Sequence, residues 1–170
     1  MSTTLVRVNT YTHSVTFVTD KMLASLRRII YWTGLDQSKL LNDWITVERG
    51  VYTWLKSHHL VQLILEIFNP QTSKLVGRWD FDISYSTKTD EDGEFWVDTD
   101  AIRYAIKKQG LIPSDCTYSI FATTKVGSDE VQGWGPAELR STEGFVRHCV
   151  GTTIGANQLA SGTAYWRPKA

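Results

Sequence analysis

The residues of this sequence that can hold a metal ion are few and scattered. His58 and His59 are adjacent, so their side chains diverge on most backbones and do not converge on one ion. His148 and Cys149 are adjacent as well, but no second pair of ligands stands at the spacing that a zinc site needs. The sequence therefore predicts no metal site.

Loops that bind calcium, phosphate or an acyl group are also missing. In the acidic run Asp90 to Gly93, setting Gly93 sixth in a calcium loop puts Lys88 first and Thr99 twelfth, where acids are required. No glycine-rich segment between a strand and a helix ends in Lys-Ser or Lys-Thr, and no serine lies in a hydrolase elbow. We expect no catalytic residue and no cofactor.

One pair of carboxylates keeps an enzyme as an alternative. Asp80 and Asp82 are two residues apart, so they share one face of a strand and can in principle act as an acid and a base. On the outer face of a strand, such residues are more often solvated charges. The sequence therefore favours a protein that is not an enzyme.

Composition and charge favour a globular, cytoplasmic protein without a membrane span. The chain has 170 residues, 42% of them hydrophobic, and its 18 basic and 18 acidic residues cancel. This balance gives no electrostatic case for a dominant role in nucleic-acid binding. The longest apolar run, Leu60 to Phe68, is interrupted by Gln62 and Glu66 and is too short to span a membrane. Cys116 and Cys149 do not indicate a disulfide.

Hydrophobic periodicity predicts three helices and several strands that would position any binding residues. Gly50 lies inside the second helix, which indicates a break or a close helix contact there. Asp98 or Thr99 is expected to cap the third helix. The expected helices cover about 11–32, 38–56 and 100–109, and the expected strands about 60–68, 75–85, 95–97 and 117–124.

Residues 127–170 differ from the rest, because the pattern of helices and strands breaks down there. The segment holds seven of the twelve glycines but keeps large apolar residues, which a disordered tail would lack. We interpret it as a strap that lies on the body and is able to come off. Its large apolar residues are Trp134, Leu139, Phe145, Val146, Ile154, Leu159, Tyr165 and Trp166.

Taken in order, several segments make the chain resemble a bacterial HORMA-domain protein. The resemblance implies an α+β HORMA fold, with three main helices on a mostly antiparallel sheet and a C-terminal safety belt. It implies a single domain over 1–170, with a core of about 1–126 and a belt of about 127–170. The segments are Tyr11 to Asp20, Leu65 to Pro70, Arg78 to Ile83, Tyr104 to Lys108 with Gly110 and Leu111, Arg140 to Gly144, and Tyr165 to Arg167.

The family resemblance also implies partners. Proteins of this kind resemble regulators in cyclic-oligonucleotide-based antiphage signalling (CBASS) operons. The belt would close over a closure-motif peptide, and the closed form would activate a cGAS/DncV-like nucleotidyltransferase, a CD-NTase. An AAA+ remodelling ATPase would reopen the belt. A second HORMA protein is a further expected partner, and nucleic acid is expected only as part of a complex.

The predicted peptide site combines the belt with a sheet edge, since backbone hydrogen bonds hold a peptide that adds to such an edge. We expect Arg140 to Val146 to face the peptide, and Trp79 to Tyr85 to form the edge. The alternative is a constitutive scaffold with a permanently docked tail. The belt residues are Trp134, Leu139, Arg140, Ser141, Thr142, Gly144, Phe145 and Val146, and the edge residues are Trp79, Phe81, Ile83 and Tyr85.

Overall fold

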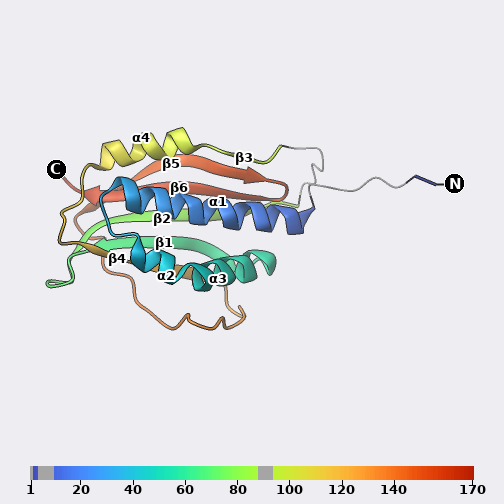
Figure 1. Cartoon of the computed structure of the whole chain (residues 1–170), viewed down its shortest axis with the longest axis horizontal. Helices are drawn as coiled ribbons and strands as arrows, with labels where there is room; N and C mark the ends of the chain where they lie inside the picture. The colour runs from blue at the N-terminus through green and yellow to red at the C-terminus, as the bar shows by residue number, and fades with distance from the viewer. Residues whose placement is uncertain (1, 4–9, 88–93) are drawn as a thin grey trace.

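A layer of helices covers one face of an antiparallel sheet (Figure 1). The structure is a computed structural model and describes residues 2–3, 10–87 and 94–170. The acidic run Asp90 to Gly93 lies outside these residues. Within them the fold is α+β, as expected, with a sheet of six strands in the order β3-β5-β6-β2-β1-β4. The strands are β1 Leu60–Phe68, β2 Leu75–Tyr85, β3 Trp96–Val97, β4 Thr117–Thr124, β5 Phe145–Ala156 and β6 Leu159–Pro168.

The helices are α1 Tyr11–Trp32, α2 Ser38–Asn42, α3 Trp44–Lys56 and α4 Thr99–Gln109. The stripe of α1 that packs against the sheet recurs every three or four residues, as its sequence predicts, and α3 and α4 flank it (Figure 1). The Asp98 carboxylate caps α4 by accepting a hydrogen bond from the Ala101 N–H at 3.0 Å. The single helix expected over 38–56 is wrong in one detail, because it divides into α2 and α3 at Asp43.

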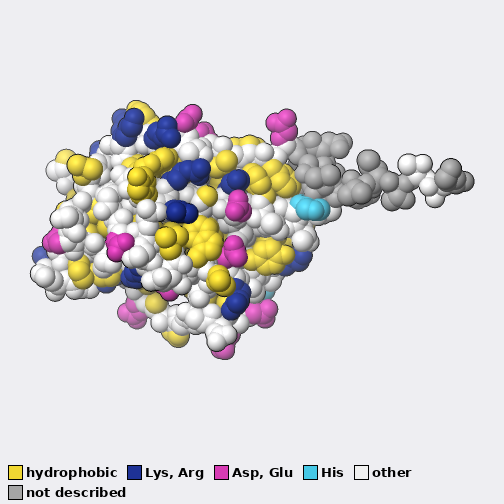
Figure 2. All heavy atoms as spheres, in the orientation of Figure 1, with side chains coloured by type: hydrophobic (Ala, Val, Ile, Leu, Met, Phe, Trp, Pro, Cys, Tyr) yellow, Lys and Arg dark blue, Asp and Glu magenta, His cyan; other side chains and the backbone are white. Residues whose placement is uncertain are grey.

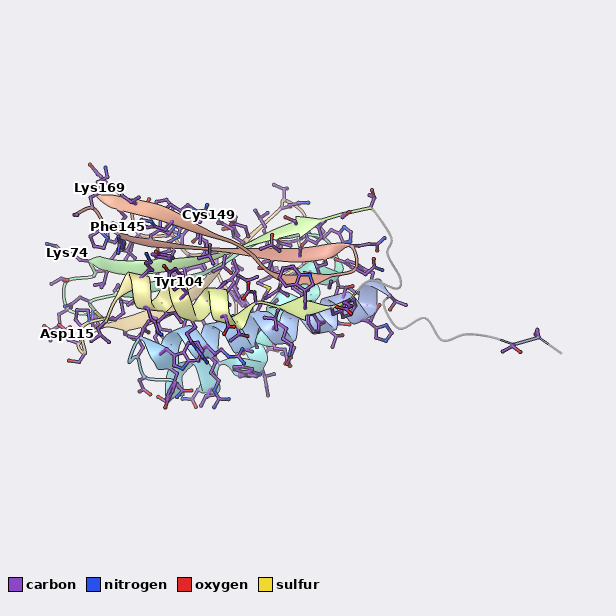
Figure 3. All side chains as sticks on the ribbon, turned by 90° about the horizontal axis from the view of Figure 1, so that it is seen from above. Lys74, Tyr104, Asp115, Phe145, Cys149 and Lys169 are labelled. Atoms are coloured by element: carbon purple, nitrogen blue, oxygen red, sulfur yellow. The ribbon has the colours of Figure 1, made fainter. Side chains whose placement is uncertain are left out.

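The C-terminal segment is more regular than its glycine content predicts. The β5 and β6 strands form a hairpin, and β6 pairs with β2 along residues 78–85. The expectation of an irregular tail is therefore wrong for residues 145–168. Figure 3 shows the open end of this hairpin, where Phe145 and Lys169 lie near Lys74.

The hairpin also corrects the predicted sheet edge. Because β2 pairs with β1 on one side and β6 on the other, its backbone has no free edge. Trp79 and Phe81 are fully buried in the core, while Ile83 and Tyr85 are partly buried against it. The expectation that Trp79 to Tyr85 form an open edge is therefore wrong. The strand at the edge of the sheet beyond β2 and β1 is β4.

A buried carboxylate ties the hairpin to β2 on the sheet face away from the helices. Asp80 is only 1% exposed and accepts hydrogen bonds from Arg78 Nε at 2.7 Å and Trp166 Nε1 at 2.9 Å. The Asp80 carboxylate also forms an ion pair with Arg147 Nε at 3.4 Å. Asp80 therefore joins β2 to both β5 and β6, and the expectation of a solvated charge is wrong for this residue.

Asp82 is the exposed member of the pair. Its side chain is 43% exposed and forms an ion pair with Arg147 Nη2 at 2.5 Å. Burial lowers the pKa of Arg147, but the hydrogen bond and attraction to Asp82, together with Asp80, outweigh it and leave the pKa above its ordinary value. Both carboxylates thus have structural partners.

We predict that Asp80→Ala destabilises the protein by about 3–5 kcal/mol, because it leaves two guanidinium groups and an indole N–H without their buried acceptor. Asp82→Ala removes a carboxylate from the same strand and face, but should cost only about 1 kcal/mol or less because the group is solvated. Urea unfolding of the two variants measures both values. Equal losses would contradict this assignment.

Candidate functional site

The edge of β4 is the part of the sheet that offers backbone groups to a further strand. The β4 strand pairs with β1 on one side, and no described strand pairs with the other. The Lys39 ammonium donates a hydrogen bond to the Tyr118 carbonyl, which shows that this carbonyl points away from β1. Because strand backbone groups alternate in direction, the N–H and C=O groups of Ile120 and Ala122 also point outward. These groups form an edge that can accept a strand.

Tyr118 fixes this edge to the helix layer. Its hydroxyl donates to the Asp36 carbonyl at 2.6 Å and accepts from the Leu40 N–H at 3.0 Å. Burial is the main cause that raises the pKa of Tyr118, and the hydroxyl therefore stays protonated and able to donate. The ring thus holds β4 against the start of α2.

Residues 125–144, called the crossing loop here, leave β4 and run back beside its edge (Figure 1). The first half of the loop docks on α3. The Trp54 indole donates a hydrogen bond to the Asp129 carbonyl at 2.8 Å, and Val131 is buried in the core. The Trp134 indole donates to the Thr46 carbonyl at 2.9 Å and meets the Trp54 ring edge-on at 5.1 Å between centroids.

Two glycines make this docking sterically feasible. The Trp134 indole packs directly on Gly50 in α3, where a Cβ atom would lie 2.6 Å from its Cε2 atom. Gly133 has a φ of 93°, and a Cβ there would lie 2.5 Å from Thr46 Cγ2. The sequence predicts a break or a close helix contact at Gly50, but the helix divides at Asp43 instead, and the residue packed on Gly50 comes from the loop rather than from another helix.

The second half of the loop is held on the opposite face of the sheet. Glu66 alternates with the core residues Leu65 and Ile67, so its side chain points away from the helices. Its carboxylate is fully buried and accepts hydrogen bonds from the Arg140 backbone N–H at 2.7 Å and from Arg140 Nη1 at 2.8 Å. The same guanidinium stacks on Phe68 with its carbon 3.5 Å from the ring centroid. Arg140 Nε also donates to the Ser73 carbonyl at 2.9 Å.

The crossing loop therefore passes around the β4 edge, from the helix face at Trp134 to the opposite face at Arg140. Between these two contacts, residues 135–139 are exposed. A cavity of about 340 Å³ lies between the edge and the loop, and its walls come from α2 and α3, β4 and the loop. Its lining includes Leu40, Val47, Tyr118, Ile120 and Trp134.

The structure separates the predicted belt residues into two groups. Trp134 and Arg140 both dock the loop on the body, and Leu139 lies between them and is 38% exposed. Phe145 and Val146 instead lie in β5, paired with Pro168 and Arg167. Since β6, β2 and β1 lie between β5 and β4, those two residues are remote from the β4 edge.

Ser141, Thr142 and Gly144 form the turn that leads from the loop into β5. The Ser141 hydroxyl accepts a hydrogen bond from the Glu143 N–H at 3.1 Å, and the Thr142 carbonyl accepts from the Phe145 N–H at 2.9 Å. The Gly144 carbonyl accepts from the Lys169 N–H at 2.9 Å. These residues position the end of the loop rather than line the cavity.

The sequence interpretation missed Glu66, Lys39 and the β4 residues. One signal was available for Glu66, because a charged residue within the apolar run Leu60 to Phe68 requires a buried partner. No group of three or more metal-ligating side chains occurs among the described residues. None of the helices in that part of the chain is long and apolar enough to cross a membrane.

The fold is that of a known class of domain. The sequence model of bacterial HORMA domain 2 matches residues 3–169, and the chain belongs to this family. The resemblance that the sequence predicted is therefore confirmed. A comparison with curated proteins gives no match.

Several solved structures share this fold at low sequence identity. A chain of the mitotic checkpoint complex is 10% identical, with a TM-score of 0.73 over 92% of this chain and 99% of that one. C. elegans HTP-1 bound to the HIM-3 closure motif is 11% identical, with a TM-score of 0.71, and the match covers 94% of this chain and 92% of that one. A chain of the E. coli MS115-1 CdnC:HORMA-deltaN complex is 14% identical, with a TM-score of 0.62, and the match covers 100% of this chain and 94% of that one. At these identities the likeness shows the fold alone.

We predict that Gly50→Ala loosens the crossing loop. Alanine favours an α-helix by about 1 kcal/mol over glycine, so α3 itself should not weaken. The added methyl group displaces Trp134 from its site, which should raise amide hydrogen exchange in residues 127–139 by about tenfold or more. Gly135→Ala is the control, because nothing lies within 4 Å of its Cβ position. Unchanged exchange in Gly50→Ala would contradict the role of this contact.

Arg140→Ala should release the other side of the loop. It leaves the Glu66 carboxylate buried without its guanidinium, which costs about 3 kcal/mol locally and corresponds to roughly 100-fold faster exchange in residues 137–144. Arg167→Ala serves as the control, since Arg167 contacts the Lys108 carbonyl, away from the loop. If both variants exchange alike in this segment, the Glu66–Arg140 contact does not hold the loop.

Proposed function

We propose that this HORMA domain binds a closure-motif peptide as an added strand on the β4 edge, beneath the crossing loop. The observation that carries the proposal is the path of the loop from Trp134 on one face of the sheet to Arg140 on the other. A strand added to β4 would lie between the edge and the loop. The backbone groups of Ile120 and Ala122 would hold it. The structure of HTP-1 bound to the HIM-3 closure motif supports a closure motif as the ligand, since HTP-1 has the same fold.

The loop acts on the kinetics of binding more than on affinity. Each backbone hydrogen bond contributes only about 1 kcal/mol net, so a short added strand alone would bind modestly after association costs. A peptide beneath the loop leaves only when the loop opens locally, which requires the Trp134 or the Arg140 contact to break. The domain is then a conformational switch that holds its peptide for as long as the loop stays closed.

The wider role we propose is regulation of a CD-NTase in CBASS antiphage defence. The E. coli structure of CdnC with a HORMA protein supports a nucleotidyltransferase as partner. In this proposal the peptide-bound form activates the enzyme, and an AAA+ remodelling ATPase supplies the work that reopens the loop. The domain itself performs no catalysis. We place the boundary between core and belt near residue 126, and the end of β4 at Thr124 supports this choice.

The β5–β6 hairpin makes truncation of the chain an unsuitable test of the proposal. Deletion of residues 127–170 removes β5 and β6, and this uncovers the buried Trp79 and Phe81 of β2. A shortened chain therefore gives no clean test of binding. Substitutions in the loop and at the β4 edge are better tests, because they leave the hairpin in place.

We predict that Ala122→Pro abolishes peptide binding. Proline removes the outward N–H of the edge strand but leaves the bonds to β1, and edge positions tolerate proline. Ala122→Ser is the matched control, because it keeps the N–H. The measurement uses a peptide selected by phage display on the purified domain, with the dissociation constant read for each variant. Equal affinity of the proline and serine variants would place the peptide elsewhere.

The rival function is a constitutive scaffold whose loop never opens. In a switch, the selected peptide raises protection against hydrogen exchange in residues 118–124 and 127–144, and Arg140→Ala speeds its dissociation. In a scaffold, exchange in these segments is the same with and without the peptide.

A further inference from the structure

A second surface, on the outside of the helix layer, has the features of a protein-docking site. Two hollows of about 490 and 830 Å³ lie along α1 and meet at Asp20, which lines both. Figure 2 shows this face, where hydrophobic side chains gather between the helices and Lys and Arg side chains flank them. We call the two hollows together the α1 groove. It is separate from the β4 edge, because α3 stands between them.

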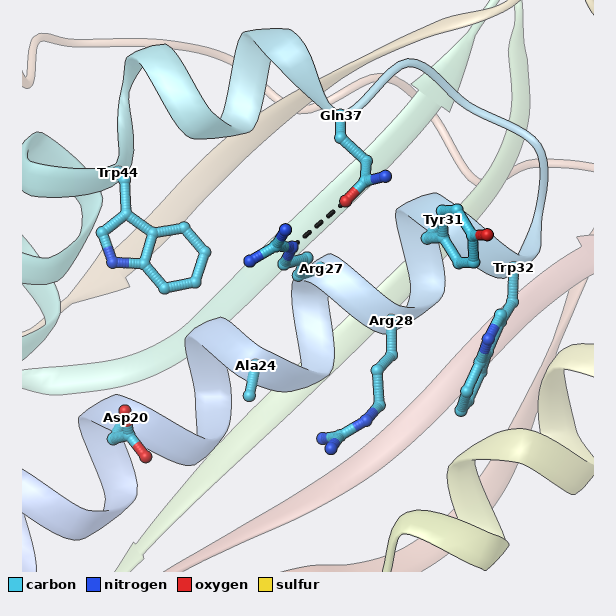
Figure 4. A pocket seen from close by; sticks show the side chains of 8 residues that line it. All are labelled: Asp20, Ala24, Arg27, Arg28, Tyr31, Trp32, Gln37 and Trp44. Carbon is cyan, nitrogen blue, oxygen red and sulfur yellow. Dashed lines mark hydrogen bonds between the residues drawn. The ribbon is translucent and has the colours of Figure 1, made fainter.

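The first hollow combines arginines with aromatic rings. Its floor is the α1 stripe Asp20, Ala24, Arg27, Arg28 and Tyr31, spaced by three or four residues. Figure 4 shows Trp44 on one side of this stripe and Trp32 on the other. Tyr31 is 62% exposed. Trp, Tyr and Arg are the residue types that most often dominate the energy of protein interfaces.

Among the described residues, the arginines of this hollow have no acidic partner. Arg27 Nε donates to Gln37 Oε1 at 3.1 Å, and Arg28 makes no hydrogen bond or ion pair within the described part of the chain. The acid that lines the hollow, Asp20, pairs with Lys21 at 3.3 Å. The surface therefore presents two guanidinium groups whose charge is not compensated locally.

The second hollow is more apolar and lies between α1 and α3. Phe17 and Phe95 meet there with ring centroids 5.1 Å apart, and Tyr52 and Ile45 line the α3 side. Ile45 is 66% exposed and lies beside the half-buried rings of Phe17 and Tyr52, so apolar surface is open to solvent here. One end of the groove thus favours apolar contacts and the other favours carboxylates.

We propose that the α1 groove binds a protein segment that places carboxylates on Arg27 and Arg28 and apolar side chains against Phe17, Ile45 and Tyr52. The charge of the groove selects the occupant, because an acidic segment compensates both arginines. A nucleic acid fits less well, because a phosphate at every nucleotide would also meet Asp20 and Glu48, whereas a protein segment can place its carboxylates on the arginines alone. A partner here can bind while a peptide occupies the β4 edge.

A peptide selection with charge reversal tests this inference. A phage library of random 16-residue peptides is selected on the Ala122→Pro protein, so that peptides held at the β4 edge are not recovered. Enriched peptides should carry Asp or Glu beside aromatic or aliphatic residues. Arg27→Glu with Arg28→Glu should weaken these peptides at least tenfold, and replacing their acids by Lys should restore binding to that variant. Ile45→Ser should also weaken them.

The control is Lys107→Glu with Lys108→Glu, which makes the same change of net charge on α4 and should leave binding unchanged. Three results would overturn the proposal: no enrichment over the unselected library, enriched peptides without acids, or equal binding to the arginine variant. Binding of a single-stranded oligonucleotide that depends on Arg27 and Arg28, with no peptide enriched, would also overturn it and assign the groove to nucleic acid. Because Ala122→Pro blocks only the β4 edge, failure here leaves the proposed peptide function untouched.

Discussion

The buried carboxylate of Glu66 is the constraint on which the arrangement of the loop depends. It lies on the sheet face away from the helices with no exposed surface, and its hydrogen-bond donors both come from Arg140. An unpaired charge at this position is strongly unfavourable, so the folded protein requires residues 125–144 to cross the β4 edge and reach it. Trp134 fixes the same loop on the helix face. A loop held on both faces encloses the edge between them.

The α3 helix connects the two proposed binding surfaces. One side of it receives the loop at Thr46, Gly50 and Trp54, and its other side forms a wall of the α1 groove with Ile45 and Tyr52. Helices pack as rigid units, so a change in how the loop docks can reach the groove through small shifts of α3. The same helix would thus provide a physical route between the proposed peptide site and the proposed partner site on the outer face.

The sequence predicts local structure well here and pairing poorly. Apolar periodicity and capping residues define α1, α4, β1, β2 and β4, because these signals are local. The β5–β6 hairpin was not predicted, because bulges at Cys149/Gly151 and Thr152/Ile154 interrupt the alternation of apolar and polar residues along β5. Trp79 to Tyr85 were misplaced at an edge because their second neighbour, β6, lies some 80 residues later in the chain. Arg140 was found through the family resemblance, whereas its partner Glu66 needed the fold.

The central claim is that the crossing loop must open for a peptide to enter or leave, and a disulfide across the loop tests it most directly. A Cβ at position 133 would lie 3.6 Å from Thr46 Cβ, within the range of disulfides, although a φ of 93° strains a residue other than glycine there. The measurement is the peptide dissociation rate of Thr46→Cys with Gly133→Cys, in a Cys116→Ser and Cys149→Ser background. Oxidation after loading should slow dissociation at least 100-fold until the disulfide is reduced, and oxidation before loading should prevent binding. Equal dissociation rates in the oxidised and reduced protein would contradict the account.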